Sequence, residues 1–309
     1  MLSEKDFIKK FIKPLGDKRG KNSFDFTDDV AVINNYAYST DTIVEDIHFF
    51  KKDKPQFIAK KLVRVNVSDL LAKGVKPEYC LFNFSAGKIV NKRWINIFID
   101  SFNSDLKKYK ISLIGGDTVN TKATTVLGLT IFGKIPSKGI KLRSNAKKSD
   151  FIYVSGTIGD SSIGMNLIKK KIRFDKKCKE NLILRYNIPL PRMDLLKLIQ
   201  NKANASTDIS DGLLVDLNNI CKMSELGAEI SFSKIPKSSD VKRFISKNIK
   251  YEKLILTGGD DYQVLFTGPK GLDSYKNVTN IGKMTKEKGI KIIDRNFSDL
   301  VKGYSHSLY

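Results

Sequence analysis

The sequence predicts an α/β protein with α+β character, organised as two domains. Short segments rich in β-branched and aromatic residues alternate along the chain with longer segments of helical periodicity. No solenoid-type repeat or low-complexity tract interrupts this alternation. The length of 309 residues is enough for two ordinary domains, and the content of 41% hydrophobic and 28% charged residues is typical of a folded globular protein.

The first half of the chain is predicted to combine short strands with two long helices. The first of these helices carries apolar residues at 58, 62, 65 and 70, and it is expected to end before Gly74, with Pro77 beyond it. The expected strands are 29–33, 36–40, 78–86, 111–114 and 124–135, and the expected helices are 55–73 and 91–110.

A domain junction is expected within residues 136–150, which lack periodicity and contain Pro, Gly, Ser and Lys. We therefore predict an N-terminal domain of residues 1–138 and a C-terminal domain of residues 139–309. The expected strands of the second half are 151–156, 263–268 and 288–294, and its expected helices lie near 161–171, 176–187 and after the DISDG segment.

Composition also bounds the cellular setting. No run approaches the roughly 18 to 20 apolar residues that a membrane span requires, and the N-terminal stretch MLSEKDFIKKFIKPLG is amphipathic and charged rather than a signal sequence. We expect a cytoplasmic protein without membrane contact. The three cysteines, Cys80, Cys178 and Cys221, are far apart and form no CxxC pair, so we expect neither a disulfide nor a zinc site.

The net charge of +22 could attract nucleic acid or anionic metabolites. Of the 55 basic residues 46 are Lys and nine are Arg, and no stacking aromatic residues lie between them. Base recognition usually favours Arg and aromatic platforms. We therefore interpret the excess as lysine on solvated faces, with a general attraction for anionic substrates as the alternative and nucleic-acid binding as an unlikely main function.

Aspartates stand next to most of the apolar segments. They are Asp28 and Asp29 before the first strand, Asp41 after the second, Asp69 inside a helix, and Asp117, Asp208 and Asp211 after later strands. Carboxylates at strand ends and helix starts of an α/β core are placed to converge in a crevice, where such folds bind ligands. The sequence therefore predicts one acidic site built from both halves of the chain.

Two similar segments, LIGGD at 113–117 and LTGGD at 256–260, sharpen this expectation. In each, an apolar run that reads as a strand is followed by two glycines and an aspartate. We expect the glycines to let the backbone turn and approach a ligand closely, with the aspartate held at the end of the strand.

So many carboxylates imply a bound cation. Two like charges about 4 Å apart repel by roughly 4 kcal/mol at an effective dielectric constant near 20. The chain has only two histidines, His48 and His306, so the hard oxygen ligands favour Mg²⁺, which usually joins carboxylates to substrate phosphates. The chain has no GxGxxG segment, and GDKRGKN at 16–22 fails the spacing of a phosphate-binding loop.

Each residue also has a structural alternative. An aspartate at a turn is more often a turn residue or a helix cap than a ligand, and Asp211 could cap the helix that follows it. Asp69 could pair with Lys73 on a solvated helix face, and Asp216 is interpreted as a surface acid of its helix. His48 could be a core histidine. The combination of all these segments in one chain favours the acidic site.

Seven segments together resemble the thiamine-monophosphate kinase family of the AIR synthetase-like superfamily, from about Asp28 to Tyr304. They are TDDVAVI, STDTIVEDIHF, NVSDLLAKGVKP, LIGGDTV, TDISDGLLVDL, GGDDYQVLFT and GYSHS, in this order. The resemblance implies a two-domain AIR synthetase-like fold that dimerises through the sheet of its N-terminal domain. It also implies ATP-dependent phosphorylation of thiamine monophosphate to thiamine diphosphate with several Mg²⁺ ions.

The resemblance assigns roles to individual residues. The implied metal ligands are Asp28, Asp29, Ser39, Thr40, Asp41, Asp69, Asp117, Asp208 and Asp211, with Asp41, Asp117 and Asp211 as the catalytic set. The implied ATP contacts are Tyr109, Gly116, Asp117, Arg143 and Ser210, and the implied substrate contacts are His48, Asp260 and Tyr304. The chain departs from the family pattern at Thr27 and Asp46, where the family has Gly, and at Asp260, where it has Glu.

Two other interpretations remain open. A selenophosphate or AIR synthetase would share the ATP and Mg²⁺ carboxylates, but a selenophosphate synthetase normally has a reactive Cys or selenocysteine near its N-terminus. The segment before Asp28 contains no cysteine. The second alternative is a basic nucleic-acid-binding protein in which the acids are structural.

Overall fold

The structure is a computed structural model that describes residues 2–16 and 20–297. Within these residues, none of the helices combines the length and the apolar character that crossing a membrane would require. The helices are α1 (Glu4–Phe7), α2 (Pro55–Ala72), α3 (Lys92–Tyr109), α4 (Asp160–Lys169), α5 (Lys176–Asn187), α6 (Leu196–Lys202), α7 (Leu213–Met223), α8 (Ser239–Lys247) and α9 (Leu254–Thr257). The strands are β1 (Ala31–Ile33), β2 (Tyr36–Val44), β3 (Tyr79–Ala86), β4 (Ser112–Asn120), β5 (Val126–Lys134), β6 (Phe151–Ser155), β7 (Ser206–Asp208), β8 (Gly227–Ile230), β9 (Val264–Gly268), β10 (Val278–Thr285) and β11 (Gly289–Ile292).

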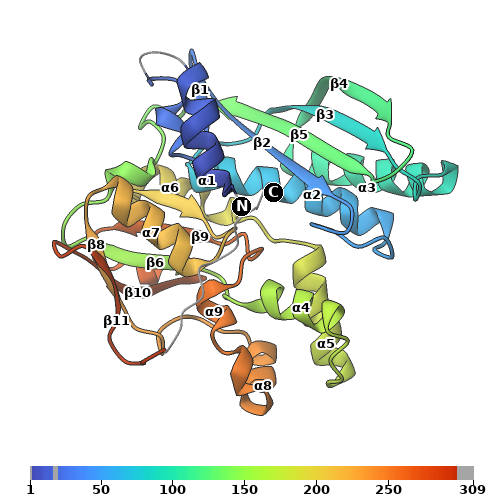
Figure 1. Cartoon of the computed structure of the whole chain (residues 1–309). Helices are drawn as coiled ribbons and strands as arrows, with labels where there is room; N and C mark the ends of the chain where they lie inside the picture. Colours follow the sequence, from blue (N-terminus) through green and yellow to red (C-terminus); the bar gives the residue numbers. More distant parts are fainter. Residues whose placement is uncertain (1, 17–19, 298–309) are drawn as a thin grey trace.

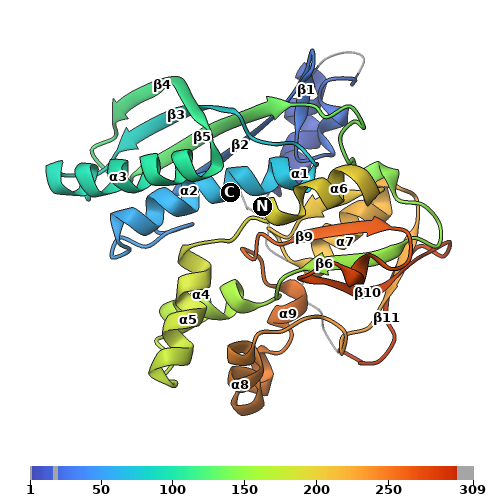
Figure 2. The ribbon, with the colours of Figure 1, turned by 180° about the vertical axis from the view of Figure 1, so that it is seen from behind.

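The first sheet has the order β1-β2-β5-β3-β4, and only its β3–β4 pair is parallel. Helices α2 and α3 lie along one face of this sheet, and no helix of the described residues covers the other face (Figures 1 and 2). On that uncovered face Tyr38, Phe132 and Tyr79 are paired across β2, β5 and β3, with ring centroids 4.9 and 5.6 Å apart. The outer face of the first sheet therefore presents aromatic surface.

Helix α2 is buried on nearly all sides because it contacts β2 and β5 above and β7, β9 and α6 below (Figure 1). Apolar residues such as Leu62 and Leu70 are fully buried, but so are Lys61, Asn66 and Lys73. Buried polar groups need partners, so these side chains are committed to specific hydrogen bonds inside the protein.

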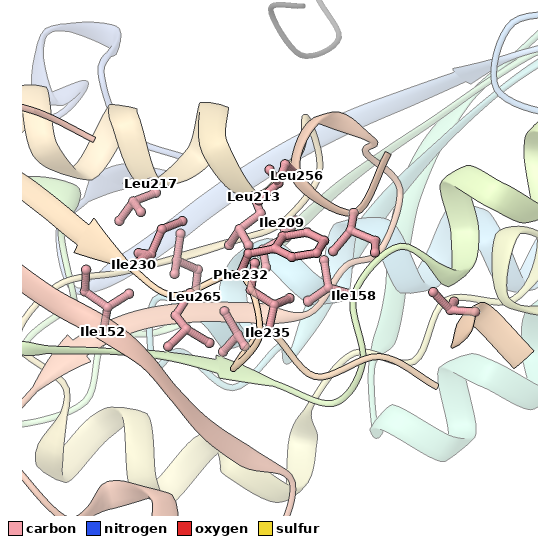
Figure 3. Packing of buried hydrophobic residues seen from close by; sticks show 14 of the residues in the cluster. Ile152, Ile158, Ile209, Leu213, Leu217, Ile230, Phe232, Ile235, Leu256 and Leu265 are labelled. Carbon is pink, nitrogen blue, oxygen red and sulfur yellow. The ribbon is translucent and has the colours of Figure 1, made fainter. Parts of the chain in front are cut away.

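The second sheet has the order β11-β8-β10-β6-β9-β7 and carries helices on both faces. Along β6, Ile152 and Val154 point into a cluster with α4, α7 and α8, and Tyr153 points into a second cluster with α6. Figure 3 shows part of the larger cluster, in which Leu213 and Leu217 of α7 gather with the labelled residues Ile209, Ile230 and Leu265.

The predicted fold class is confirmed, since helices alternate with strands in two sheets. The expected strands and helices are present except the strand before Gly258, which is the helical turn α9 instead. Strands β7, β8 and β10 and helices α1, α6 and α8 were not predicted. Both sheets are mainly antiparallel, so the acids do not gather at the carboxyl ends of parallel strands. Asp41, for example, lies inside β2 rather than after it. The domain boundary at 138/139 stays a prediction.

The two Gly-Gly-Asp segments do not follow the expected pattern. Strand β4 does not end at Gly115 but continues to Asn120, and all its residues are exposed rather than buried. The register shifts at Ile114, and a Cβ on Gly116 (φ +153°) would lie 1.8 Å from the carbonyl oxygen of Phe82 on β3. The second segment follows the helical turn α9 instead of a strand. In both, the second glycine allows another backbone to come close.

Candidate active site

A cleft of about 660 Å³ lies between the two domains. Its lining includes the predicted residues Asp28, Asp29, Ser39, Thr40, Asp41, His48, Asp69, Ser210, Asp211 and Asp260. It also includes residues that were not predicted, among them Glu4, Ile8, Phe26 and Tyr262. The cleft therefore collects most of the expected acidic site in one place.

The local structure of β2 opens this cleft. Strand β1 pairs with β2 only at Tyr36–Tyr38, so from Ser39 onward no described strand occupies that edge of β2. In place of a neighbouring strand, Asn66 of α2 binds this part of β2: its Oδ1 accepts a hydrogen bond from the Asp41 backbone amide at 2.9 Å. Residues Thr40 and Thr42 lie on the outer face, where the Thr40 and Thr130 hydroxyls are 3.1 Å apart.

Four carboxylates, the buried Asp208 and the half-buried Asp41, Asp69 and Asp211, form one end of the acidic cluster. Burial and the charges of neighbouring aspartates raise the pKa of Asp41 to about 6, that of Asp208 to about 7, and that of Asp69 well above its ordinary value. Burial also raises the pKa of Asp211. The Oδ1 atom of Asp208 is buried without a hydrogen-bond partner in the described residues. The four carboxylates therefore repel one another when they are ionised.

Asp28 and Asp29 form the other end and already have cationic partners. The Lys73 ammonium lies 2.7 Å from Asp28 Oδ1 and 2.6 Å from Asp29 Oδ2, and the Arg143 guanidinium pairs with Asp29 Oδ1. Burial opposes ionisation of Asp29, but Arg143 and Lys73 outweigh it and lower the pKa of this carboxyl. Arg143, an expected ATP contact, is thus engaged with Asp29 and with the hydroxyl of Thr207.

Two of the expected substrate contacts, His48 and Asp260, also line the cleft. The carbonyl of His48 accepts hydrogen bonds from Lys61 Nζ at 2.9 Å and from the Tyr186 hydroxyl at 3.0 Å. Lys61 Nζ lies 3.4 Å from Asp260 Oδ2 and 3.6 Å from the centroid of the Tyr186 ring. Asp260 Oδ1 accepts from the Tyr262 hydroxyl at 3.2 Å. Lys61 therefore links the two expected substrate contacts, His48 and Asp260.

Three expected residues, Asp117, Gly116 and Tyr109, lie away from the cleft. Asp117 is in register with Asn83, Gly128 and Thr42, so three strand spacings, about 14 Å, separate it from β2. Gly116 is on the same edge strand. Tyr109 is buried at the end of α3, and burial raises the pKa of its hydroxyl to about 12. Tyr304 lies outside the described residues.

Two structural alternatives from the sequence are wrong. Lys73 does not pair with Asp69 on a solvated face, because it is fully buried and contacts Asp28 and Asp29. Asp216 is not a surface acid: it is buried, and its Oδ2 accepts the backbone amides of Asp211 and Gly212 at 3.3 and 3.1 Å.

The sequence contains only a weak indication that Asp216 is buried and none that Lys73 is. An acid in the first turn after Gly212 could have indicated that Asp216 holds the start of α7. A helix capped by lysine gives no comparable signal, so the burial of Lys73 could not be predicted.

The residues present fit Mg²⁺ in donor type but do not form a closed cage. In residues 2–16 and 20–297, no three acidic, His or Cys side chains are grouped closely enough to hold a metal by themselves. Mg²⁺ is usually bound by one or two carboxylates together with substrate phosphates and water. The partnerless Asp208 Oδ1 beside Asp69 and Asp41 is consistent with such partial coordination.

Comparison with known proteins identifies the family. The AIR synthase related protein N-terminal domain matches residues 27–135, and the C-terminal domain of the same family matches residues 147–295. The thiamine-monophosphate kinase of Buchnera aphidicola subsp. Schizaphis graminum is 38% identical over 300 residues, covering 94% of this chain and 88% of that protein. The chain belongs to the thiamine-monophosphate kinase family.

Further members of the family support this assignment. The thiamine-monophosphate kinase of Escherichia coli strain K12 is 36% identical over 249 residues, covering 79% of this chain and 75% of that protein. The solved structure of AaThiL complexed with AMPPCP and TMP matches with a TM-score of 0.87 at 29% identity, covering 99% of this chain and 97% of that one. E. coli HypE, at 17% identity and a TM-score of 0.69, shares the fold.

Proposed function

We propose that the chain transfers the γ-phosphoryl group of ATP to thiamine monophosphate, giving ADP and thiamine diphosphate. The observation that carries this proposal is the cleft that gathers Asp41 and Asp69 of one domain with Asp211 of the other, with the buried Asp208 close to Asp41 and Asp69. The membership of the chain in the thiamine-monophosphate kinase family names the substrate.

The reaction needs no general base. The second pKa of a phosphate monoester is about 6, so at pH 7 the acceptor is largely a dianion and a sufficient nucleophile. An oxygen of thiamine monophosphate forms a bond to the γ-phosphorus as the bond from that phosphorus to the bridging oxygen of ADP breaks. The obstacle is repulsion between two anions, and the site must bring them together in line.

Asp41, Asp69, Asp208 and Asp211 are the residues that would hold Mg²⁺ here. When bound, Mg²⁺ would neutralise charge on both phosphates and align them for direct transfer. The chain contributes further positive potential at the start of α7, where Asp216 fixes the amides of Asp211 and Gly212.

His48 and Asp260 are proposed to position thiamine monophosphate in the cleft. Lys61 fixes both of them through the His48 carbonyl and the Asp260 carboxylate. Asp260 is one methylene shorter than the glutamate that the family resemblance implies, and its carboxylate reaches Lys61 Nζ at 3.4 Å.

A second copy of the chain is proposed to complete the site. The outer face of the first sheet is uncovered, carries the Tyr38–Phe132–Tyr79 row, and exposes Leu81 beside them. Exposed apolar surface of this kind marks protein contact sites. Two sheets stacked through these faces would bring Gly116 and Asp117 of one copy toward Thr40 and Thr42 of the other. The Gly-Gly-Asp segment of β4 would then serve the ATP site of the partner.

The test is to supply ATP, Mg²⁺ and thiamine monophosphate to the purified chain and to follow ADP and thiamine diphosphate together. Equal amounts of both are expected, and exhaustive chelation should stop the reaction. Labelled ADP should not exchange into ATP when thiamine monophosphate is omitted, because direct transfer forms no phosphorylated side chain. Exchange that disappears in His48→Ala would overturn direct transfer. A cytoplasmic location stays a prediction.

A further inference from the structure

The side chain of Lys73 is enclosed at the end of α2. It is fully buried, and its Nζ lies 2.7 Å from Asp28 Oδ1, 2.6 Å from Asp29 Oδ2 and 2.6 Å from the carbonyl oxygen of Ser206. An ammonium group has three N–H donors, so all of them are used. Because Ser206 belongs to β7, this one side chain also joins α2 of the N-terminal domain to the second sheet.

The two carboxylates that Lys73 contacts have no free oxygen. Asp28 Oδ1 also accepts the amide of Asp29, and Asp28 Oδ2 accepts the amide of Arg143 at 2.8 Å. Asp29 Oδ1 accepts from the Arg143 guanidinium, and Asp29 Oδ2 accepts from the Thr207 hydroxyl at 2.9 Å. The negative charges of Asp28 and Asp29 are therefore balanced by the positive charges of Lys73 and Arg143.

The remaining four acids of the cluster lack such partners. Within the described part of the chain, Asp41, Asp69, Asp208 and Asp211 form no ion pair with Lys or Arg. Their side-chain donors are neutral hydroxyls, with Ser39 Oγ at 2.5 Å from Asp69 and Ser68 Oγ at 2.7 Å from Asp208, and Asp208 Oδ1 has no partner there.

We propose that Lys73 is a resident cation that takes the place of a divalent ion at Asp28 and Asp29. Divalent metal then binds only at the other end of the cluster, at Asp41, Asp69, Asp208 and Asp211. A metal ion at Asp29 would have to displace an ammonium whose three hydrogen bonds are all satisfied, and would leave a buried positive charge unpaired. The inference rests on the proposed function for the presence of divalent ions, and it removes Asp28 and Asp29 from the metal ligands implied by the family resemblance.

The test counts metal ions rather than turnover. Mn²⁺ is titrated into the whole purified chain with a non-hydrolysable ATP analogue, and free Mn²⁺ is followed by its electron paramagnetic resonance signal. Asp29→Asn should bind as many Mn²⁺ ions per chain as the unchanged protein, whereas Asp208→Asn should bind at least one fewer. Loss of an ion in Asp29→Asn would overturn the proposal.

A second variant creates the metal site instead of removing one. Lys73→Met leaves Asp28 and Asp29 with one cation fewer, so it should bind one additional Mn²⁺ and show a larger Mg²⁺-dependent rise in Tm. Lys76→Met, which removes an exposed lysine three residues away, should change neither quantity. An unchanged Mn²⁺ count in folded Lys73→Met contradicts the proposal. If Lys73→Met does not fold, the contrast between Asp29→Asn and Asp208→Asn decides.

The outcomes also separate this inference from the proposed function. A chain that makes thiamine diphosphate but loses Mn²⁺ in Asp29→Asn would refute the role of Lys73 alone. A chain with the expected Mn²⁺ counts but no thiamine diphosphate would refute the proposed function alone.

Discussion

The segments Gly115–Asp117 and Gly258–Asp260 have the same three residues in different settings. The first lies inside the exposed edge strand β4, hydrogen-bonded to β3 and about three strands from the cleft. The second lies in the loop after α9, with Asp260 in the left-handed region (φ +67°) and lining the cleft. Identical residues thus lie on an exposed edge strand in one domain and beside the cleft in the other.

What the two segments share is the close approach of another backbone. A Cβ on Gly116 would lie 1.8 Å from the Phe82 carbonyl oxygen, and a Cβ on Gly259 would lie 2.1 Å from the Ser210 carbonyl oxygen. The neighbouring backbone therefore decides the conformation of each segment, and the segment itself does not specify a strand end or a turn.

Removing the acid next to the loop segment should have the largest effect. Asp211→Asn is expected to lower kcat by roughly 10³-fold, because a metal-binding charge contributes several kcal/mol to the transition state. The Tm of the metal-free chain should stay the same or rise, since one of several like charges in the cluster is lost. Steady-state kinetics and a melting scan measure both, with the exposed Asp273→Asn as the control. Near-normal turnover would mean that Asp211 is structural.

Adding a Cβ to the second glycine of each segment should prevent the close approach of the neighbouring backbone and destabilise the fold. Gly116→Ala and Gly259→Ala are each expected to cost about 1–3 kcal/mol, because the backbone at Phe82 or Ser210 must move. Gly115→Ala is the matched control, since its Cβ would meet only the end of the Leu81 side chain at 3.3 Å. Urea unfolding measures the three free energies. Equal stability of all three variants would contradict the close-approach explanation.

Removing the Lys61 ammonium, which contacts Asp260, tests whether the segment Gly258–Asp260 positions the substrate. Lys61→Met is expected to raise the KM for thiamine monophosphate about tenfold, with a smaller change in kcat, because a lost charged hydrogen bond is worth roughly 1.5 kcal/mol. Lys60→Met is the control on the same helix. An unchanged KM in Lys61→Met would separate Asp260 from substrate placement.

The smallest expected effect is on how the stability of the metal-free chain depends on pH. The pKa of Asp208 is raised from 3.8 to about 7, so the folded state keeps a proton that the unfolded state loses. The resulting stability is fully present below pH 3.8 and is lost as pH rises to about 7. The Asp208→Asn side chain does not titrate, so this contribution does not fall with pH in the variant. Its Tm relative to that of the unmodified chain should therefore rise by a few degrees between pH 3.8 and about 7. A constant difference in Tm would show that Asp208 titrates normally.

The sequence predicted the acidic residues of the cleft better than their partners. Asp41, Asp69 and Asp211 could be recognised because several acids stand next to or within the predicted elements, and a cluster of carboxylates needs a cation. Lys61 and Lys73 could not, because their burial depends on the second domain packing against α2, which is a long-range contact. The path of β4 through Gly116 was missed for a related reason, since its backbone is fixed by β3 and not by its own residues.

The most direct test of the shared, two-copy site is to mix two inactive variants. Asp117→Asn and Asp211→Asn are expected to be inactive alone, but a mixed dimer contains one site with an intact Asp211 and an intact Asp117 from the partner. After the two variants are unfolded and refolded together in equal amounts, thiamine diphosphate formation should reach about a quarter of the unmodified rate, because half of the dimers are mixed and each has one complete site. If native mass spectrometry detects mixed dimers but no activity returns, the site is not shared between copies as proposed.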